Sequence, residues 1–139
     1  MLTGISNLLS PELLKILMEM GHGDEFVLGD GNFPAASHAQ RLVRADGHHI
    51  LAMLDAILPL FPLDYAMDFS AVLMDNRGIE PTVWTCYRQK LSMYPEGNKP
   101  FLVISKPEFY ERAKNAYCVV ATGEMEKFAN IILRKGIIT

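Results

Sequence analysis

The hydrophobic positions along the chain form short continuous runs that alternate with longer stretches carrying an apolar stripe. Five apolar runs are bounded by turn-forming residues, namely Phe26–Leu28, Ala71–Met74, Phe101–Ile104, Tyr117–Val120 and Ile131–Leu133. Runs this short and this continuous are typical of strands that are buried on both faces. We therefore predict five strands in one largely parallel sheet.

Helical patterns lie between most of these strands. The segment 10–12, Ser-Pro-Glu, offers an N-cap residue and a proline suited to the first helical position, and Gly21 can end the helix about 10 residues later. Three further helices are expected at 50–58, 82–94 and 108–116. Strands that alternate with helices predict an α/β fold, and we expect a three-layer α/β/α sandwich.

Length and charge narrow the possible partners. The chain has 139 residues, half of them hydrophobic, which is enough for one compact core, so we predict a single domain over residues 1–139. The net charge is -3 and no basic cluster is present, which argues against nucleic acid or a membrane surface as partner. A small neutral ligand fits this composition better.

The sequence also predicts where the protein works. No apolar run approaches the roughly 18 residues of a membrane span, and the first twenty residues lack the features of a signal peptide. The two cysteines, Cys86 and Cys118, have neither metal-ligand spacing nor the density of a disulfide framework. We therefore expect a soluble, cytoplasmic protein.

His22 is the first candidate for chemistry, because Gly21 and Gly23 on either side let the backbone bend and a ligand approach closely. The alternative is a histidine that only complements the negative end of the preceding helix. The sequence alone leaves both interpretations open. Asp24 and Glu25, which follow, are expected to be solvated or capping groups.

Asp30 is the second candidate. It lies in a glycine-rich turn, 29–34, after a predicted strand, where open α/β sheets form ligand crevices. Its carboxylate could hold a pair of sugar hydroxyls, or it could form an Asx-turn with its own backbone. The segment 44–47, Arg-Ala-Asp-Gly, has the same ambiguity, with a turn-stabilising ion pair as the alternative.

The third candidate is the triplet 128–130, Phe-Ala-Asn, which precedes the last strand. Asn130 offers both a donor and an acceptor to a hydroxyl group, and Phe128 could stack on a ring or simply belong to the core. Structural roles are expected for His38, His48 and His49, which lack metal-ligand spacing. With no phosphate loop, dinucleotide fingerprint or zinc motif, we predict neither cofactor nor metal.

Several segments, each weak alone, form a specific signal in their order and spacing. They cover nearly the whole chain, at 10–14, 20–25, 32–35, 44–47, 109–113, 122–124 and 130–136. Together they resemble the ribose pyranase / fucose mutarotase family. The segments at 44–47, 59–64 and 109–113 are more similar to the fucose branch of that family than to the ribose branch.

The resemblance implies a cofactor-independent isomerase that interconverts the anomers of a free monosaccharide, L-fucose in this branch, by opening and closing the sugar ring. It also implies a ring-shaped homo-oligomer, typically a decamer. Two alternatives stay open: pyranose/furanose exchange on D-ribose, and a monosaccharide-binding module without catalysis.

The resemblance further assigns roles to residues. The proton donor falls on His22, and the sugar contacts fall on Asp30, Lys106 and the triplet Phe128, Ala129 and Asn130. Phe128 departs from the family's tyrosine, and an unpaired hydrogen-bonding group of this kind can cost about 1–3 kcal/mol. Lys106 departs from arginine, because it keeps the charge but not the planar fork.

The spacing of His22 and Asp30 raises a geometric problem. Eight extended steps of roughly 3.3 Å would separate them by about 26 Å, which is too far for one monosaccharide. Either Gly23 and Gly29 fold the ends inward, or a neighbouring subunit completes the site. We favour a site between subunits.

Overall fold

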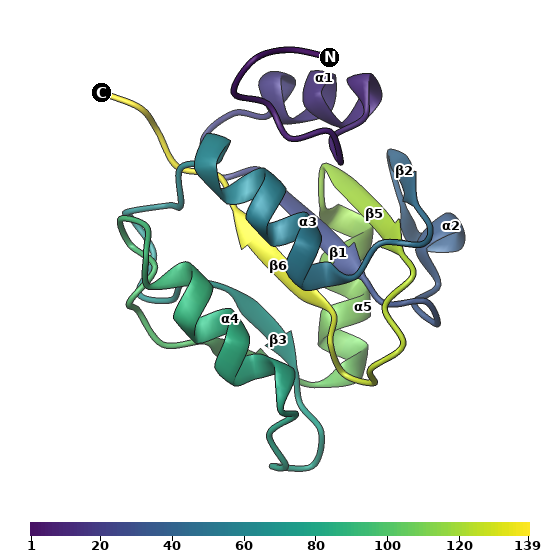
Figure 1. The fold of residues 1–139 in the computed structure, drawn as a ribbon. Coiled ribbons are helices and arrows are strands. Elements are labelled where there is room, and N and C mark those ends of the chain that lie inside the picture. Colours follow the sequence, from purple (N-terminus) through teal and green to yellow (C-terminus); the bar gives the residue numbers. More distant parts are fainter.

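A computed structural model describes all residues, 1–139, and places one six-stranded sheet between helices (Figure 1). The strands are β1 (Glu25–Gly29), β2 (Leu42–Ala45), β3 (Val72–Met74), β4 (Leu102–Ile104), β5 (Cys118–Thr122) and β6 (Ile131–Arg134). Their order is β2-β5-β1-β6-β3-β4, and only β6 runs antiparallel to its neighbours. The predicted α/β class with a mainly parallel sheet is confirmed.

Helices cover both faces of the sheet. They are α1 (Pro11–Glu19), α2 (Ala35–His38), α3 (Ile50–Ile57), the 3-10 helix η1 (Leu58–Leu60), α4 (Val83–Leu91) and α5 (Lys106–Asn115). Helices α1, α3 and α4 pack over the larger core of 28 buried residues. Helices α2 and α5 pack over the other face, in a core of 11 buried residues. The three layers are those expected from the sequence.

All five predicted strands are present, as β1, β3, β4, β5 and β6. Burial on both faces is correct for β1, β3, β5 and the predicted run 131–133 of β6. It is wrong for β4, because β4 is an edge strand whose Val103 is 43% exposed. The strand at the other edge, β2, was not predicted. Its four residues alternate between buried and exposed, and Arg44 points to solvent, so no continuous apolar run marks it.

The helix starts follow from capping. Ser10 Oγ accepts a hydrogen bond from the Leu13 amide at 3.1 Å, which confirms the predicted start of α1. Helix α5 begins at Lys106, two residues earlier than predicted, because Ser105 Oγ caps it by accepting from the Glu108 amide. The four-residue helix α2 was missed. None of the helices is long and apolar enough to cross a membrane.

The strand directions divide the loops into two groups. The carboxyl ends of β1 to β5 and the start of β6 lie along one end of the sheet. This line of strand ends is here called the carboxyl edge, and it is distinct from the edge strands β2 and β4. The start of β1 and the end of β6 lie at the opposite edge, here called the amino edge. Every candidate residue can be assigned to one of these two edges.

Gly136 closes the amino edge after β6, and its amide donates to the Pro62 carbonyl at 2.7 Å. A Cβ at this position would lie 2.3 Å from the Leu63 carbonyl oxygen, which is backbone and cannot move aside cheaply. We expect Gly136→Ala to lower the free energy of unfolding by about 1–3 kcal/mol in urea denaturation.

Gly21→Ala is the matched control for Gly136→Ala. The nearest atom to a Cβ at Gly21 is Asp24 Oδ2 at 3.7 Å, an ordinary contact, so its stability should change little. Equal stabilities of the two variants would contradict the role given to Gly136.

Candidate active site

The predicted site residues are divided between the two edges of the sheet. Asp30 follows β1, Lys106 follows β4 and the triplet 128–130 precedes β6, so all of these lie at the carboxyl edge. His22 lies before β1, at the amino edge. Because the five residues of β1 span about 16 Å, one chain does not bring His22 to Asp30. Gly23 has a positive φ of 88°, but the turn there does not remove this separation.

Asp30 and Asn130 are joined directly. The Asp30 amide donates to Asn130 Oδ1 at 2.7 Å, and both residues are buried. Asp30 Oδ1 also accepts from the Asn32 amide at 2.9 Å, so the Asx-turn weighed from the sequence is present. Burial raises the pKa of Asp30, and the charge of Glu124 adds to this effect, against hydrogen bonds that lower it.

The triplet 128–130 is held from helix α4. Phe128 adopts a positive φ of 58°, unusual for a residue with a large side chain. Trp84 Nε1 donates to the Phe128 carbonyl at 3.0 Å, and the Tyr87 hydroxyl donates to the Ala129 carbonyl at 2.6 Å. The Phe128 ring is partly buried against the smaller core, so it belongs at least partly to the core.

The Lys106 side chain forms no hydrogen bond or ion pair within the chain. Its Nζ lies 5.5 Å from the centroid of the Tyr110 ring. The Tyr110 ring in turn meets Phe33, in the loop after Asp30, edge to face at 5.5 Å. Lys106 is therefore linked to the Asp30 loop through two aromatic rings rather than by direct contact.

His22 is fixed by a buried carboxylate. Its Nε2 lies 2.8 Å from Asp64 Oδ1, and the Asp64 side chain is only 2% exposed, whereas that of His22 is 41% exposed. The Tyr65 ring stacks on the imidazole at 5.7 Å. A carboxylate acceptor places the proton of a neutral imidazole on Nε2 and leaves Nδ1 free to take another. This contact, rather than the end of helix α1, determines the environment of His22.

Asp64 belongs to a chain of ion pairs along the amino edge. Arg134 Nε lies 2.8 Å from Asp64 Oδ2, and Arg134 also lies 3.7 Å from the carboxylate of Glu25. Arg112 binds both oxygens of Glu25, at 2.9 and 2.7 Å. Glu25 is buried, so the expectation of a solvated or capping group was wrong for it. The carboxylate of Asp24 accepts from the Gly21 amide at 2.7 Å in the exposed turn after α1, and it caps no helix end.

Opposing effects act on the carboxyl group of Asp64. Burial by itself would raise its pKa, but hydrogen bonds from the Ala66 amide, His22 and Arg134 outweigh burial and lower the pKa below its ordinary value. Asp64 therefore stays ionised at neutral pH and can stabilise a protonated His22.

Sequence reasoning missed Asp64, Glu124 and His49. His49 Nδ1 lies 2.8 Å from Glu124 Oε2, and the Glu124 carbonyl accepts from the Gly31 amide, beside Asp30. The position of Glu124, two residues after β5 at the carboxyl edge, was a usable signal. Nothing local to the sequence marks Asp64, which lies 42 residues from its histidine.

The remaining polar candidates have structural contacts. Arg44 and Asp46 form an exposed two-point ion pair, at 3.0 and 2.7 Å, which is the turn-stabilising alternative. His38 Nδ1 contacts the hydroxyl of its neighbour Ser37. No three His, Cys, Asp or Glu side chains are grouped so that they could hold a metal ion.

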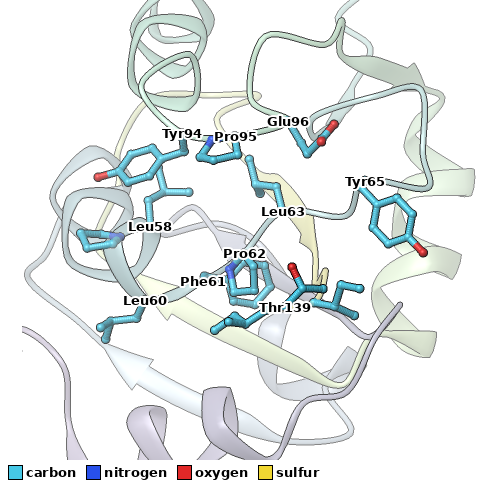
Figure 2. Close-up of a pocket in the computed structure, with 13 residues that line it drawn as sticks. Leu58, Leu60, Phe61, Pro62, Leu63, Tyr65, Tyr94, Pro95, Glu96 and Thr139 are labelled. Atoms are coloured by element: carbon cyan, nitrogen blue, oxygen red, sulfur yellow. The ribbon is translucent and has the colours of Figure 1, made fainter.

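An apolar cavity of about 600 Å³ opens at the amino edge (Figure 2). It is lined by residues 58–63, Tyr65, 94–96 and 137–139. Tyr65, which stacks on His22, forms part of its wall, so the cavity borders the histidine. A second, smaller cavity of about 400 Å³ lies beside Asp30 at the carboxyl edge.

Comparison with known proteins identifies close relatives over nearly the whole chain. The model of the RbsD / FucU transport protein family matches residues 3–138. The fucose mutarotase of Mus musculus is 45% identical over 97% of this chain and 94% of its own length. The L-fucose mutarotase of Haemophilus influenzae (strain PittGG) is 44% identical over 99% of this chain and 97% of its own length.

The fold has equally close relatives. The crystal structure of the fucose mutarotase in complex with L-fucose from Streptococcus pneumoniae superposes with a TM-score of 0.93. That protein is 47% identical in sequence, and the match covers 99% of this chain and all of the other. Both the sheet and the loops at its two edges are therefore part of the likeness.

The two buried aspartates should affect stability in opposite directions. Because burial raises the pKa of Asp30 above 3.8, its ionisation opposes folding as the pH rises through the folded-state pKa. Asp30→Asn should therefore raise the thermal midpoint at pH 7, and the gain should shrink as the pH is lowered towards 3.

Asp64→Asn is the matched comparison. The folded-state pKa of Asp64 lies below 3.8, so its contribution is present above that pH and is lost as the pH falls through the lower value. We expect Asp64→Asn to lower stability by about 1–3 kcal/mol at pH 7 and by less in acid. If both Asp30→Asn and Asp64→Asn raised stability at pH 7, or both lowered it, this assignment would be contradicted.

Proposed function

Because this chain belongs to the RbsD / FucU transport protein family, we propose that it is an isomerase that interconverts the α and β anomers of free L-fucose. The observation that carries the proposal is the near full-length likeness, at 44–47% identity, to proteins named as fucose mutarotases. The histidine held by a buried carboxylate supplies a group suited to this chemistry.

Mutarotation needs two proton transfers and no redox step. A proton leaves the anomeric hydroxyl and another reaches the ring oxygen, while the bond between the anomeric carbon and the ring oxygen breaks to give the open aldehyde. Reclosure on the other face reverses both transfers. An imidazole with a pKa near neutrality can act in both directions, and such general acid–base catalysis contributes about 10²–10⁴-fold.

His22 is the proposed proton donor. Asp64 holds Nε2 and stays ionised, so the imidazolium that forms when Nδ1 takes a proton is stabilised by an adjacent negative charge. Asp64 itself is a positioning residue, since the imidazole and Ala66 cover its Oδ1 and Arg134 covers its Oδ2.

The carboxyl edge is the proposed sugar-binding half of the site. Asp30 and Asn130 would hold sugar hydroxyls, and the backbone around Ala129 would contact the sugar. Lys106 and Phe128 complete the proposed set of contacts. Support comes from the hydrogen bond between Asp30 and Asn130, and from helix α4, which fixes the triplet through two carbonyl groups.

We propose that the site is assembled between copies of the chain in a ring-like homo-oligomer, a decamer as in the family resemblance. The reason is geometric: His22 and Asp30 lie at opposite edges of the sheet, so one copy would offer His22 to the carboxyl edge of another. The free thiols of Cys86 and Cys118 fit the cytoplasmic location predicted for the protein.

Saturation-transfer NMR tests the reaction. We expect the protein to accelerate exchange between the anomers of L-fucose, and His22→Ala to reduce the rate by about 10²-fold or more while the fold is kept. His48→Ala is the matched control, because the His48 side chain makes no hydrogen bond or ion pair and the sequence predicts only a structural role for it.

Two other outcomes of the same NMR measurement would support the alternative functions. Acceleration of pyranose/furanose exchange on D-ribose in place of fucose would favour the pyranase alternative. Line broadening of the sugar without faster exchange would favour the binding module and refute catalysis.

Mixed oligomers test the site between copies. His22→Ala and Asp30→Asn should each be inactive alone, but in an equal random mixture about a quarter of the sites combine an intact His22 with an intact Asp30. We therefore expect activity to reappear after co-refolding. A mixture that stays inactive would show that both residues must come from the same chain.

A further inference from the structure

We propose that His49, oriented by the buried carboxylate of Glu124, is the second acid–base group of this site and exchanges a proton with the sugar at the carboxyl edge. This inference rests on the proposed mutarotase function and deepens it. The sequence predicted only structural roles for His48 and His49, and the family resemblance assigned none to Glu124.

The geometry of the pair leaves one imidazole nitrogen available. His49 precedes helix α3, and its Nδ1 lies 2.8 Å from Glu124 Oε2. The imidazole is 69% exposed, whereas the Glu124 side chain is only 10% exposed. A buried carboxylate that holds Nδ1 fixes the tautomer and directs Nε2 outward, where it can take or give a proton.

Hydrogen bonds tie this pair to the proposed sugar-binding residues. The Gly31 amide donates to the Glu124 carbonyl at 2.7 Å, and the Gly123 amide donates to the His48 carbonyl at 2.9 Å. Thr122 Oγ1 donates to the Gly29 carbonyl at 2.7 Å. The loops that carry Asp30, His49 and Glu124 are thus held against one another at the carboxyl edge.

Glu124 also acts on Asp30 through its charge. Its carboxylate adds to the effect of burial in raising the pKa of Asp30, which places the two acidic groups in one electrostatic environment. Glu124, which orients His49, therefore also acts electrostatically on the residue proposed to hold the sugar.

His49 repeats the arrangement of His22 at the other edge of the sheet. Each imidazole contacts a buried carboxylate at 2.8 Å, and in both cases the carboxylate is more deeply buried than the histidine. The other two histidines lack this feature: His38 contacts a serine hydroxyl, and the His48 side chain makes no hydrogen bond or ion pair. Only these two pairs have the form of an oriented acid–base group.

The reaction has a task for each histidine. In ring opening, one neutral imidazole takes the proton of the anomeric hydroxyl, and the electron pair of that O–H bond forms the aldehyde C=O. The electrons of the broken carbon–oxygen bond pass to the ring oxygen, which takes a proton from the other, protonated imidazole. Reclosure on the opposite face returns both protons, so the two histidines recover their starting states.

Substitution of His49 by glutamine tests this assignment. Gln keeps a polar side chain of similar reach but cannot exchange a proton at neutral pH. We expect His49→Gln to slow anomer exchange at saturating L-fucose by about 10²-fold, with fucose binding changed by less than about threefold and an unchanged thermal midpoint. His48→Gln, the adjacent control, should keep the wild-type exchange rate.

Glu124→Gln provides an independent variant. The amide keeps the shape of the side chain but removes the charge that stabilises the imidazolium, so the exchange rate at saturation should fall while fucose affinity persists. A merely structural role would lower the thermal midpoint or weaken binding instead, and this would overturn the proposal.

The outcomes separate this proposal from the proposed function. Full exchange activity in His49→Gln, or a loss fully explained by weaker binding, overturns the role of His49 and leaves mutarotation intact. A wild-type protein that accelerates no exchange of L-fucose overturns both.

Discussion

Strand β6 is the constraint on which both halves of the site depend. It is the antiparallel strand of the sheet, and it lies between β1 and β3. Its start is preceded by Asn130, which accepts from the Asp30 amide, and its end carries Arg134, which binds Asp64. One four-residue strand therefore connects the proposed sugar contacts at the carboxyl edge with the His22–Asp64 pair at the amino edge.

Both edges contain buried carboxylates, and these differ in how far hydrogen-bond donors offset the cost of burying a charge. Asp64 and Glu25 are surrounded by guanidinium, imidazole and amide donors, which offset the cost of burial. Asp30 receives fewer such contacts and has a raised pKa. A carboxylate that is incompletely compensated in the free protein is one that hydroxyl donors of a ligand could satisfy, so the local cost in stability fits a binding role.

The sequence predicted the central strands well, because β1, β3, β5 and β6 are continuous apolar runs of the kind expected for strands buried on both faces. The edge strand β4 carries such a run as well, so the pattern alone does not tell a central strand from an edge strand. Sequence reasoning failed at β2, where Arg44 faces solvent and interrupts the pattern. It identified Asp30 and Asn130 but not their contact, because 100 residues separate them. Asp64 and the pairing of His49 with Glu124 were missed for the same reason: the sheet topology, rather than local spacing, creates them.

The proposed division of the site links catalysis to assembly. Each chain carries one histidine–carboxylate pair at each edge, and the length of β1 keeps the two pairs apart. A sugar bound at one edge is therefore out of reach of the pair at the other edge. No single chain can offer both histidines to the two oxygens of one sugar. In a closed homo-oligomer every carboxyl edge can meet an amino edge of another copy, so every half-site finds its complement. The exposed His22 and the apolar cavity, which meet at Tyr65, then form the surface expected where such a neighbour packs.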